Sequence, residues 1–246
     1  MRMSLRSLSR RARIVSAAAV AVLASAALIA ASAVGAQGGA STSSSAAAAA
    51  GDVKGAADVL ALLKGIPQSG AWLGSPDAGL ELIVFADPQC PFCGQFDTRV
   101  MPALIRDYVR TGKLRVYFSG MDFVGADSSR GLKAAAAAAE QSRLWHVVSM
   151  LYDNQGAENK GWLSDKLVGN VARAIPVLDA KKFDKARKGK SIDKRLGEWK
   201  QLATSGGVTS TPTFFAGARG NYGKLEVTAL EVGQFKAALD KLIAAK

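Results

Sequence analysis

The feature that most constrains the fold is a strand, a cysteine pair and a helix in immediate succession. Residues 80–86 form a short apolar run with turn residues on both sides, which predicts a buried strand. The segment Cys90–Cys93 then opens a helical pattern that continues to Val109. Residues 113–118 alternate long polar and apolar side chains, as a strand does. Because short connections join strand, helix and strand, the two strands are expected to lie parallel in one sheet.

Cys90 and Cys93 are the only cysteines in the 246 residues. A disulfide between them closes a very short loop and constrains little of the chain. The pair is therefore better suited to redox exchange than to stabilising the fold. Pro91 suits the first helical position, and the free N–H groups and dipole of the helix start favour a thiolate at Cys90. We therefore expect Cys90 to face solvent and exchange with a partner, and Cys93 to lie inward and resolve the mixed disulfide.

The sequence gives less support to two other functions of the cysteines, zinc binding and hydrolysis. A structural zinc site needs four ligands, and besides the pair the chain has a single histidine, His146. A Cys–His hydrolase would use His146 as its base. This residue stands in the apolar helical stretch 144–148, which favours a partly buried helix residue. We predict no metal site, and no cofactor other than the redox-active Cys90–Cys93 disulfide itself.

The first 36 residues have the form of an export signal. Five arginines and no acidic residue accompany an apolar stretch from Ile14 to about Ala33, and the small residues 34–36 follow it. The stretch is about 20 residues long, enough to span a bilayer, so residues 1–36 are a cleaved signal peptide or a retained membrane anchor. Either places the rest of the chain in an extracytoplasmic space, where disulfides persist.

The remaining chain divides by composition. Residues 37–51 are Gly, Ser, Thr and Ala with one Gln, which predicts a flexible linker, and residues 52–246 have the length of one domain with an insertion. Without the five N-terminal arginines, 27 basic side chains face 20 acidic ones. The basic residues are not interleaved with aromatic residues and do not form a recognisable nucleic-acid-binding motif, so we expect no nucleic-acid partner. The basic run 181–190 has acids on both sides and predicts a solvated helix face.

A helical block separates the first strands from the last ones. Four helical patterns follow one another without a strand, at 130–152 (capped by Ser128 and Ser129), 164–174, 178–188 and 192–204. The strand pattern resumes at 213–216, with a turn at 217–223, a strand at 224–227 and a closing helix at 230–244. The predicted class is α/β, with a small sheet, helices on its faces, and a helical block inserted after the first strand–helix–strand unit.

Thr211 and Pro212 directly precede the strand at residue 213. The proline either marks the start of an edge strand or is a cis proline packed beside Cys90. In the second case the backbone of Thr211 pairs with an incoming peptide as an added strand does.

Residues 85–93, Phe-Ala-Asp-Pro-Gln-Cys-Pro-Phe-Cys, with Thr211-Pro212-Thr213-Phe214 far downstream, resemble the DsbA-like branch of the thioredoxin superfamily. The similarity also touches 65–68, 73–74, 151–156 and 162–163, so it covers about residues 65–246. It implies a thioredoxin-like fold with an inserted helical domain at about 125–206. By this resemblance Cys90 attacks, Cys93 resolves, and Thr211, Pro212, Pro91 and Phe92 meet the substrate.

The resemblance also orders the possible functions. The leading hypothesis is an exported thiol:disulfide oxidoreductase that oxidises cysteine pairs in exported proteins and is reoxidised by a membrane redox partner. The dipeptide Pro91-Phe92 departs from the Pro-His of the best-known oxidases, which leaves the oxidising strength open. Family isomerases usually add a dimerisation domain, and residues 52–80 are too few for one, so an isomerase ranks below an oxidase. We expect a monomer. The alternatives are a reductase or isomerase, and a peptide-binding chaperone with incidental thiols.

Overall fold

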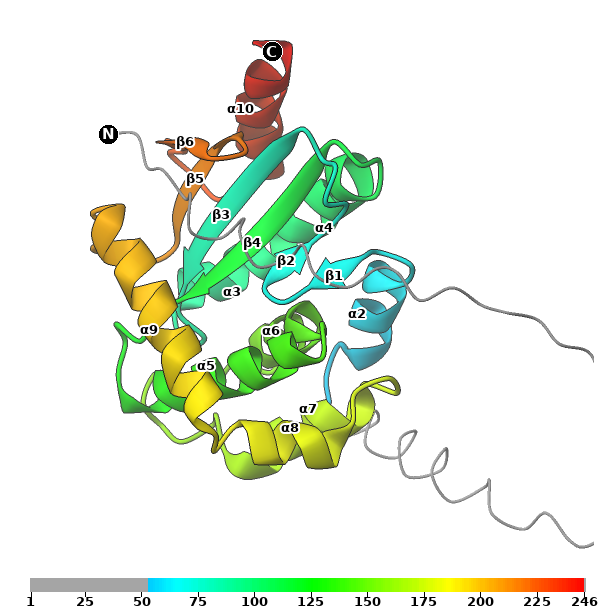
Figure 1. Ribbon diagram of the computed structural model, residues 1–246, viewed down its shortest axis with the longest axis vertical. Helices are drawn as coiled ribbons and strands as arrows, with labels where there is room; N and C mark the ends of the chain where they lie inside the picture. Colours follow the sequence, from blue (N-terminus) through cyan, green and yellow to red (C-terminus); the bar gives the residue numbers. More distant parts are fainter. Residues whose placement is uncertain (1–52, 246) are drawn as a thin grey trace, which may run out of the picture.

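The computed structural model describes residues 53–245; the predicted signal or anchor (1–36) and linker (37–51) lie outside them. Six strands form one sheet in the order β1-β2-β4-β3-β5-β6 (Figure 1). The strands are β1 (Gln68–Ser69), β2 (Trp72–Leu73), β3 (Leu80–Ala86), β4 (Leu114–Gly120), β5 (Thr213–Ala218) and β6 (Asn221–Lys224). Among the described residues, no helix is long and apolar enough to cross a membrane.

The helices fall into four groups along the chain. Helix α2 (Ala56–Leu63) precedes the sheet, and α10 (Val232–Ala244) closes the chain. Between β3 and β4 one helical run contains two π-turns; its parts are α3 (Pro91–Gln95), η1 (Phe96–Val100), α4 (Met101–Leu104) and η2 (Ile105–Val109). Between β4 and β5 lie α5 (Ala126–Glu140), α6 (Leu144–Asp153), α7 (Asp165–Ala174), α8 (Ala180–Ala186) and α9 (Lys190–Ser205).

The central pair of strands agrees with the sequence prediction. Strand β3 pairs parallel with β4, from Leu80 opposite Leu114 to Ala86 opposite Gly120. Every residue of β3 is buried, as its apolar run predicts. Strand β5 pairs antiparallel with the other edge of β3 and thereby brings the segment after Pro212 beside the end of β3.

The helix predicted over 130–152 is wrong, because two helices occupy this region and the block holds five helices rather than four. Helix α5 ends at Glu140 and α6 begins at Leu144. Between them Ser142 has a left-handed backbone with φ of 54°, which an α-helix cannot continue through. Ser128 is also not a cap: it lies inside α5 and is fully buried.

The last hairpin is shifted relative to its prediction. The expected turn at 217–223 is short in the structure, since Ala218 pairs with Asn221 and only Arg219 and Gly220 form the loop. Gly217 is a strand residue that pairs with Tyr222, and a Cβ atom there would lie 2.0 Å from the backbone oxygen of Asn221. Here a glycine permits close strand approach instead of marking a turn.

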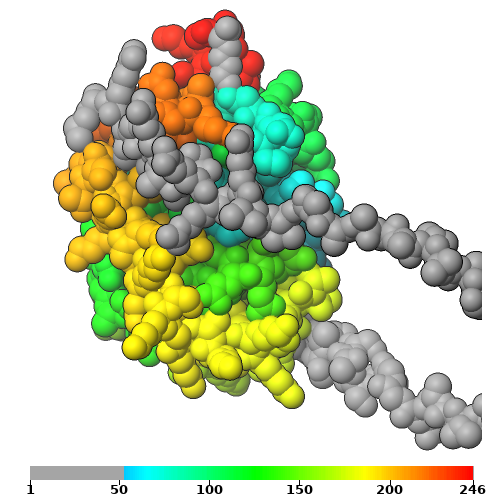
Figure 2. Space-filling model, viewed as in Figure 1, coloured from blue at the N-terminus to red at the C-terminus, as the bar shows by residue number. Residues whose placement is uncertain are grey.

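Two aromatic clusters hold the helices on the sheet. Phe96 of η1 packs against Phe214 of β5 and Phe235 of α10, with ring centroids 4.7 Å and 5.1 Å away. Phe118 of β4 meets Trp145 of α6 and Trp199 of α9 at 6.1 Å and 5.6 Å. In Figure 2 the helical block (green to yellow) forms the lower part of the visible face, and β5, β6 and α10 (orange to red) lie in the upper part. The cysteine helix α3 packs against α6 of the helical block, and η1, which follows it, packs against β5 of the sheet.

Candidate active site

The cysteine pair lies where β3 gives way to α3. Cys90 is the N-cap residue with extended backbone, Pro91 takes the first helical position as predicted, and Cys93 follows one turn later. Both thiols are free. The prediction that Cys90 faces solvent is wrong: its exposed fraction is 6%, against 1% for Cys93. Cys90 is the more accessible of the two, but it is nearly covered.

The cover of Cys90 includes the Thr211–Pro212 segment. The peptide bond between Thr211 and Pro212 is cis, which agrees with the second of the two interpretations of this proline. The Cys90 Sγ–H donates to the backbone oxygen of Thr211 at 3.4 Å, across 121 positions of sequence. The β3–β5 pairing brings these two segments together.

A groove of about 500 Å³ opens beside this contact. Phe92 and Pro212 line it together with Gln95, Phe214 and residues 224–230. Phe92 is 62% exposed. Pro91 is exposed beside it. The structure thus gathers Pro91, Phe92, Thr211 and Pro212 around Cys90.

The two thiols differ strongly in acidity. A hydrogen bond from the Cys93 thiol is the largest cause that lowers the pKa of Cys90 to about 6; the Thr211 side chain and the backbone amides of Phe92 and Cys93 act in the same direction, against burial. Burial is the main reason why the pKa of Cys93 is raised well above 9.0, and the neighbouring Cys90 raises it further. Cys90 is therefore the thiolate near neutral pH and Cys93 the protonated thiol.

A buried hydrogen-bond network, which the sequence analysis missed, holds the loop before Cys90. Asp87 is fully buried, and its Oδ1 accepts from the Ser128 hydroxyl at 2.6 Å and from the Gln89 amide at 2.8 Å. Its Oδ2 accepts from the Val124 amide at 2.8 Å. Burial raises the pKa of Asp87, although these three hydrogen bonds act against the rise.

The helical block completes this network from α6 and the loop after it. The Tyr152 hydroxyl donates to the backbone oxygen of Asp87 at 3.1 Å, and the Gln155 amide donates to the backbone oxygens of Pro88 at 3.0 Å and Cys90 at 3.1 Å. The Asn159 backbone N–H donates to Gln89 Oε1 at 2.7 Å. For Tyr152 and Gln155 the only sequence signal was the resemblance over 151–156, and Asn159 lies outside it.

Two further titratable side chains lie in the interior. Asp97 follows Cys93 by one helical turn, accepts from the Ser149 hydroxyl at 3.2 Å, and has its pKa raised to about 7 by burial. His146 is 7% exposed and hydrogen-bonds through Nδ1 to Gln68 at 3.0 Å. Burial, with a smaller contribution from Arg143, lowers its pKa to about 4. His146 is thus the buried helix residue that the sequence predicted.

These features define a class of protein: a Cys-x-x-Cys pair at the junction of strand and helix, opposite a cis proline, is the redox centre of a thioredoxin-like fold. The comparison with family models agrees. The model described as "Thioredoxin" matches residues 68–241, and the chain belongs to this family.

Known proteins narrow the class. A "Probable disulfide bond formation protein D" of Bacillus anthracis is 28% identical over 172 residues, which are 69% of this chain and 76% of that protein. Oxidised BdbD from Bacillus subtilis superposes with a TM-score of 0.62 at 17% identity, over 73% of this chain and 97% of that one. For alpha-DsbA1 of Wolbachia pipientis the TM-score is 0.58 at 22% identity, over 74% and 93%. The chain is a DsbA-like protein disulfide oxidoreductase.

Proposed function

We propose that this oxidoreductase works outside the cytoplasm and donates its Cys90–Cys93 disulfide to cysteine pairs in exported proteins. The observation that carries the proposal is the split in acidity, with the pKa of Cys90 lowered to about 6 and that of Cys93 raised. A stabilised Cys90 thiolate favours the reduced form of the pair. A pair that is stable when reduced gives up its disulfide readily.

The first step breaks the protein disulfide. A substrate thiolate attacks Cys90 Sγ, a mixed disulfide forms, and Cys93 leaves with the electron pair of the S–S bond. Because burial raises the pKa of Cys93, the leaving thiolate takes up a proton and becomes a weak nucleophile. This protonation delays the return reaction, in which Cys93 would attack the mixed disulfide.

The second step completes the oxidation of the substrate. Its second thiolate attacks the substrate sulfur of the mixed disulfide, and Cys90 leaves as a thiolate. A thiol of low pKa leaves faster, so the pKa of about 6 assists this step. The substrate loses two electrons and two protons, and the enzyme carries the electrons as its dithiol until a membrane redox partner reoxidises it.

The groove suits a peptide that presents its cysteine to Cys90. Phe92 and Pro212 line one wall, and the Thr211 backbone lies at the sulfur. An extended substrate segment along Thr211 would add backbone hydrogen bonds, as in strand addition. Export rests on residues 1–36, with their basic start and apolar stretch.

The reduction potential tests the direction of electron flow. We would equilibrate the full chain with glutathione buffers and measure the reduced fraction of Cys90 and Cys93. We expect a value closer to the about −120 mV of strong oxidants than to the about −270 mV of thioredoxin. A value at the thioredoxin end would contradict the proposal and indicate a reductase. Oxidation of a dithiol peptide that persists in Cys90→Ser would contradict the role of Cys90.

The acidity of Cys90 is tested separately by its thiolate absorbance. In Cys93→Ala the pKa of Cys90 should rise from about 6 toward 9.0, because the largest cause of its lowering is gone. Cys93→Ser keeps a hydroxyl donor and should raise the pKa less. Equal pKa values in both variants would show that the hydrogen bond from residue 93 does not set the acidity of Cys90.

A further inference from the structure

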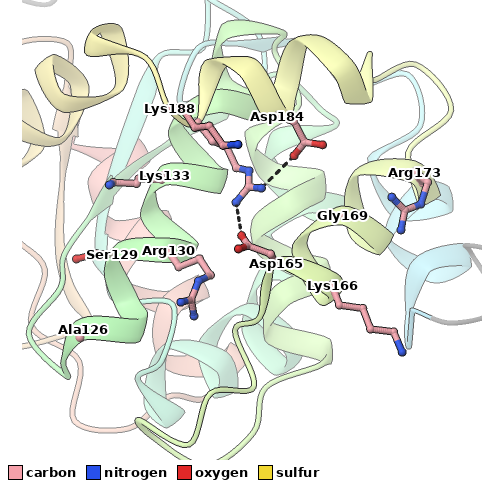
Figure 3. Close-up of a pocket in the computed structure, with 11 residues that line it drawn as sticks. Ala126, Ser129, Arg130, Lys133, Asp165, Lys166, Gly169, Arg173, Asp184 and Lys188 are labelled. Atoms are coloured by element: carbon pink, nitrogen blue, oxygen red, sulfur yellow. Dashed lines mark hydrogen bonds and ion pairs between the residues drawn. The ribbon is translucent and has the colours of Figure 1, made fainter.

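A second concave region lies in the helical block, between α5, α7 and the end of α8. It is a cleft of about 990 Å³, and Figure 3 shows the side chains that line it. We call it the basic cleft, because six of its lining side chains are cationic and only two are carboxylates. The cations are Arg130, Lys133, Lys166, Arg173, Arg187 and Lys188, and the carboxylates are Asp165 and Asp184.

Arg187 departs from the solvated helix face that the basic run 181–190 predicts. Its side chain is only 13% exposed, whereas the other cations of the run are exposed. Its guanidinium donates to Asp165 at 2.9 Å and to Asp184 at 3.0 Å. In Figure 3 the dashed lines join Asp165 and Asp184 to one guanidinium group that lies between them. Both carboxylates of the basic cleft are therefore engaged by one arginine.

The lysines of the basic cleft are left without acidic partners. Lys133 extends from α5, Lys166 from α7, and Lys188 follows α8; all three are exposed. Within residues 53–245 none of these three lysines forms an ion pair. Arg130 and Arg173 do have polar partners, in Asp127 and Asn170. Six cations against two carboxylates leave an excess of four positive charges in the lining.

The positive charges act on the same point. The pKa of Asp165 is held below its usual value mainly by Arg187, and Arg130 and Lys188 lower it further. Cations from α5 and from the end of α8 therefore act together on one carboxylate within the basic cleft. An anion in the basic cleft would be attracted by the same cations and repelled by the Asp165 carboxylate, which is already paired with Arg187.

We propose that the basic cleft binds a multivalent phosphate-bearing anion. A phosphate group carries a charge of about −1.5 to −2 and three acceptor oxygens, so that one group can bridge cations from two helices. Lysine is a common point-charge ligand for phosphate. A carboxylate supplies only one charge, and the two carboxylates of the lining together with Asp127, which pairs with Arg130, leave an excess of three positive charges. The volume of the basic cleft accommodates more than one phosphate group.

Pyrophosphate is the probe for the first test. We would titrate it calorimetrically into the full chain in non-ionic detergent at about 0.15 M salt, where interactions between exposed charges at long range are screened. The variant is Lys133→Gln/Lys188→Gln. The control is Lys113→Gln/Lys241→Gln, which removes the same charge from two exposed lysines outside the cleft lining.

We expect the cleft variant to weaken binding at least about ten-fold and the control variant less than about two-fold. Absence of pyrophosphate binding to the unchanged chain would overturn the proposal, as would an equal loss in both variants. Tighter binding of oligoglutamate than of pyrophosphate, lost in the cleft variant, would also overturn it and indicate an acidic protein segment as the ligand. Dithiol oxidation should be the same in all three proteins, because none of these lysines lines the groove beside Cys90.

Vesicles distinguish the two sources of a phosphate group. We would compare flotation with phosphatidylcholine vesicles and with vesicles that also contain phosphatidylglycerol, for the same three proteins. Any binding through residues 1–36 is common to all of them. A loss confined to the cleft variant on anionic vesicles would assign the phosphate to a lipid headgroup. Equal flotation, with pyrophosphate binding still dependent on the cleft lysines, would assign it to a soluble ligand.

Discussion

A fully buried carboxyl group lies at each end of strand β3, and the two groups have different kinds of partner. At the start of the strand, Glu81 forms an ion pair with Arg115, directly opposite on β4, and accepts from the Tyr222 hydroxyl. Just past the other end, Asp87 is held by the Ser128 hydroxyl and two backbone amides. Among the described residues, no cation forms an ion pair with Asp87.

The partners of Glu81 hold strands together, whereas the partners of Asp87 hold the loop before Cys90. Arg115 also stacks over Trp72 at 4.0 Å, so the pair at Glu81 joins three strands, β2, β4 and β3. The neutral donors around Asp87 satisfy its oxygens without a counter-charge, and burial raises its pKa. Cys90 follows three residues later and is likewise stabilised by neutral donors. The end of the strand next to Cys90 thus uses neutral hydrogen-bond donors, whereas the other end uses an opposite charge.

The largest expected effect on stability comes from removing the ion pair between Arg115 and Glu81. Arg115→Met should lower the free energy of unfolding by about 3–5 kcal/mol, because it leaves Glu81 buried without its main cation. Urea denaturation measures this loss. The pKa of Cys90 should stay at about 6, since Arg115 is not among the groups that shift it.

Arg219 provides the matched control for that experiment. It also approaches Glu81, at 3.4 Å, but its side chain is 58% exposed. Arg219→Met should therefore cost no more than about 1 kcal/mol. Similar losses in the two variants would show that burial does not decide the strength of this pair.

A second, intermediate effect concerns a carboxyl group without a counter-charge on the cysteine helix. Burial raises the pKa of Asp97 from 3.8 to about 7, so the folded state favours its protonated form. This stability is complete below pH about 3.8 and is lost as the pH rises through about 7. Asp97→Asn stays neutral, and above pH about 7 it should be more stable than the unchanged chain by about 2–4 kcal/mol.

The comparison is made by urea denaturation of the dithiol form across this pH range. The exposed Asp77 serves as control, since Asp77→Asn should follow the unchanged chain at every pH. If the curves of Asp97→Asn and the unchanged chain are parallel from pH about 4 to about 7, Asp97 does not titrate in this range.

The smallest of the three effects is expected at the neutral end of β3. Ser128→Ala removes the donor to Asp87 Oδ1 and the acceptor of the Gln89 side-chain amide. We expect a loss of about 1–3 kcal/mol in the free energy of unfolding and a further rise in the pKa of Asp87. Ser129→Ala changes the half-buried neighbour, whose hydroxyl is 3.5 Å from Asp122, and should have little effect.

Local patterns were sufficient for the central unit of the fold. The apolar run at 80–86, the proline after Cys90 and the alternation at 113–118 each predict one element, and the structure contains β3, α3 and β4 there. Short-range physics decides these elements, because side-chain periodicity and backbone preferences act within a few residues. The same local patterns misplaced the end of α5 and the last hairpin, where Ser142 and Gly217 adopt conformations that depend on neighbours.

The network around the cysteine loop had no such local signal. Ser128 lies 41 positions from Asp87, and Asn159 lies 70 positions from Gln89. Each is an ordinary polar residue in its own segment. Only the packing of the helical block against the loop turns them into partners, and burial then makes each hydrogen bond costly to lose.

By itself, the sequence determined that this chain has a Cys-x-x-Cys pair at a strand–helix junction, because the motif, the proline and the helix start are contiguous. The tertiary structure decided how that pair behaves. It placed the Thr211 backbone against Cys90, covered the sulfur that was expected to face solvent, and buried Cys93. The acidity of a thiol depends on how far water is excluded and which donors replace it. For Cys90 most of these donors lie on the cysteine helix itself, in Phe92 and Cys93, whereas the burial and the Thr211 side chain come from tertiary packing.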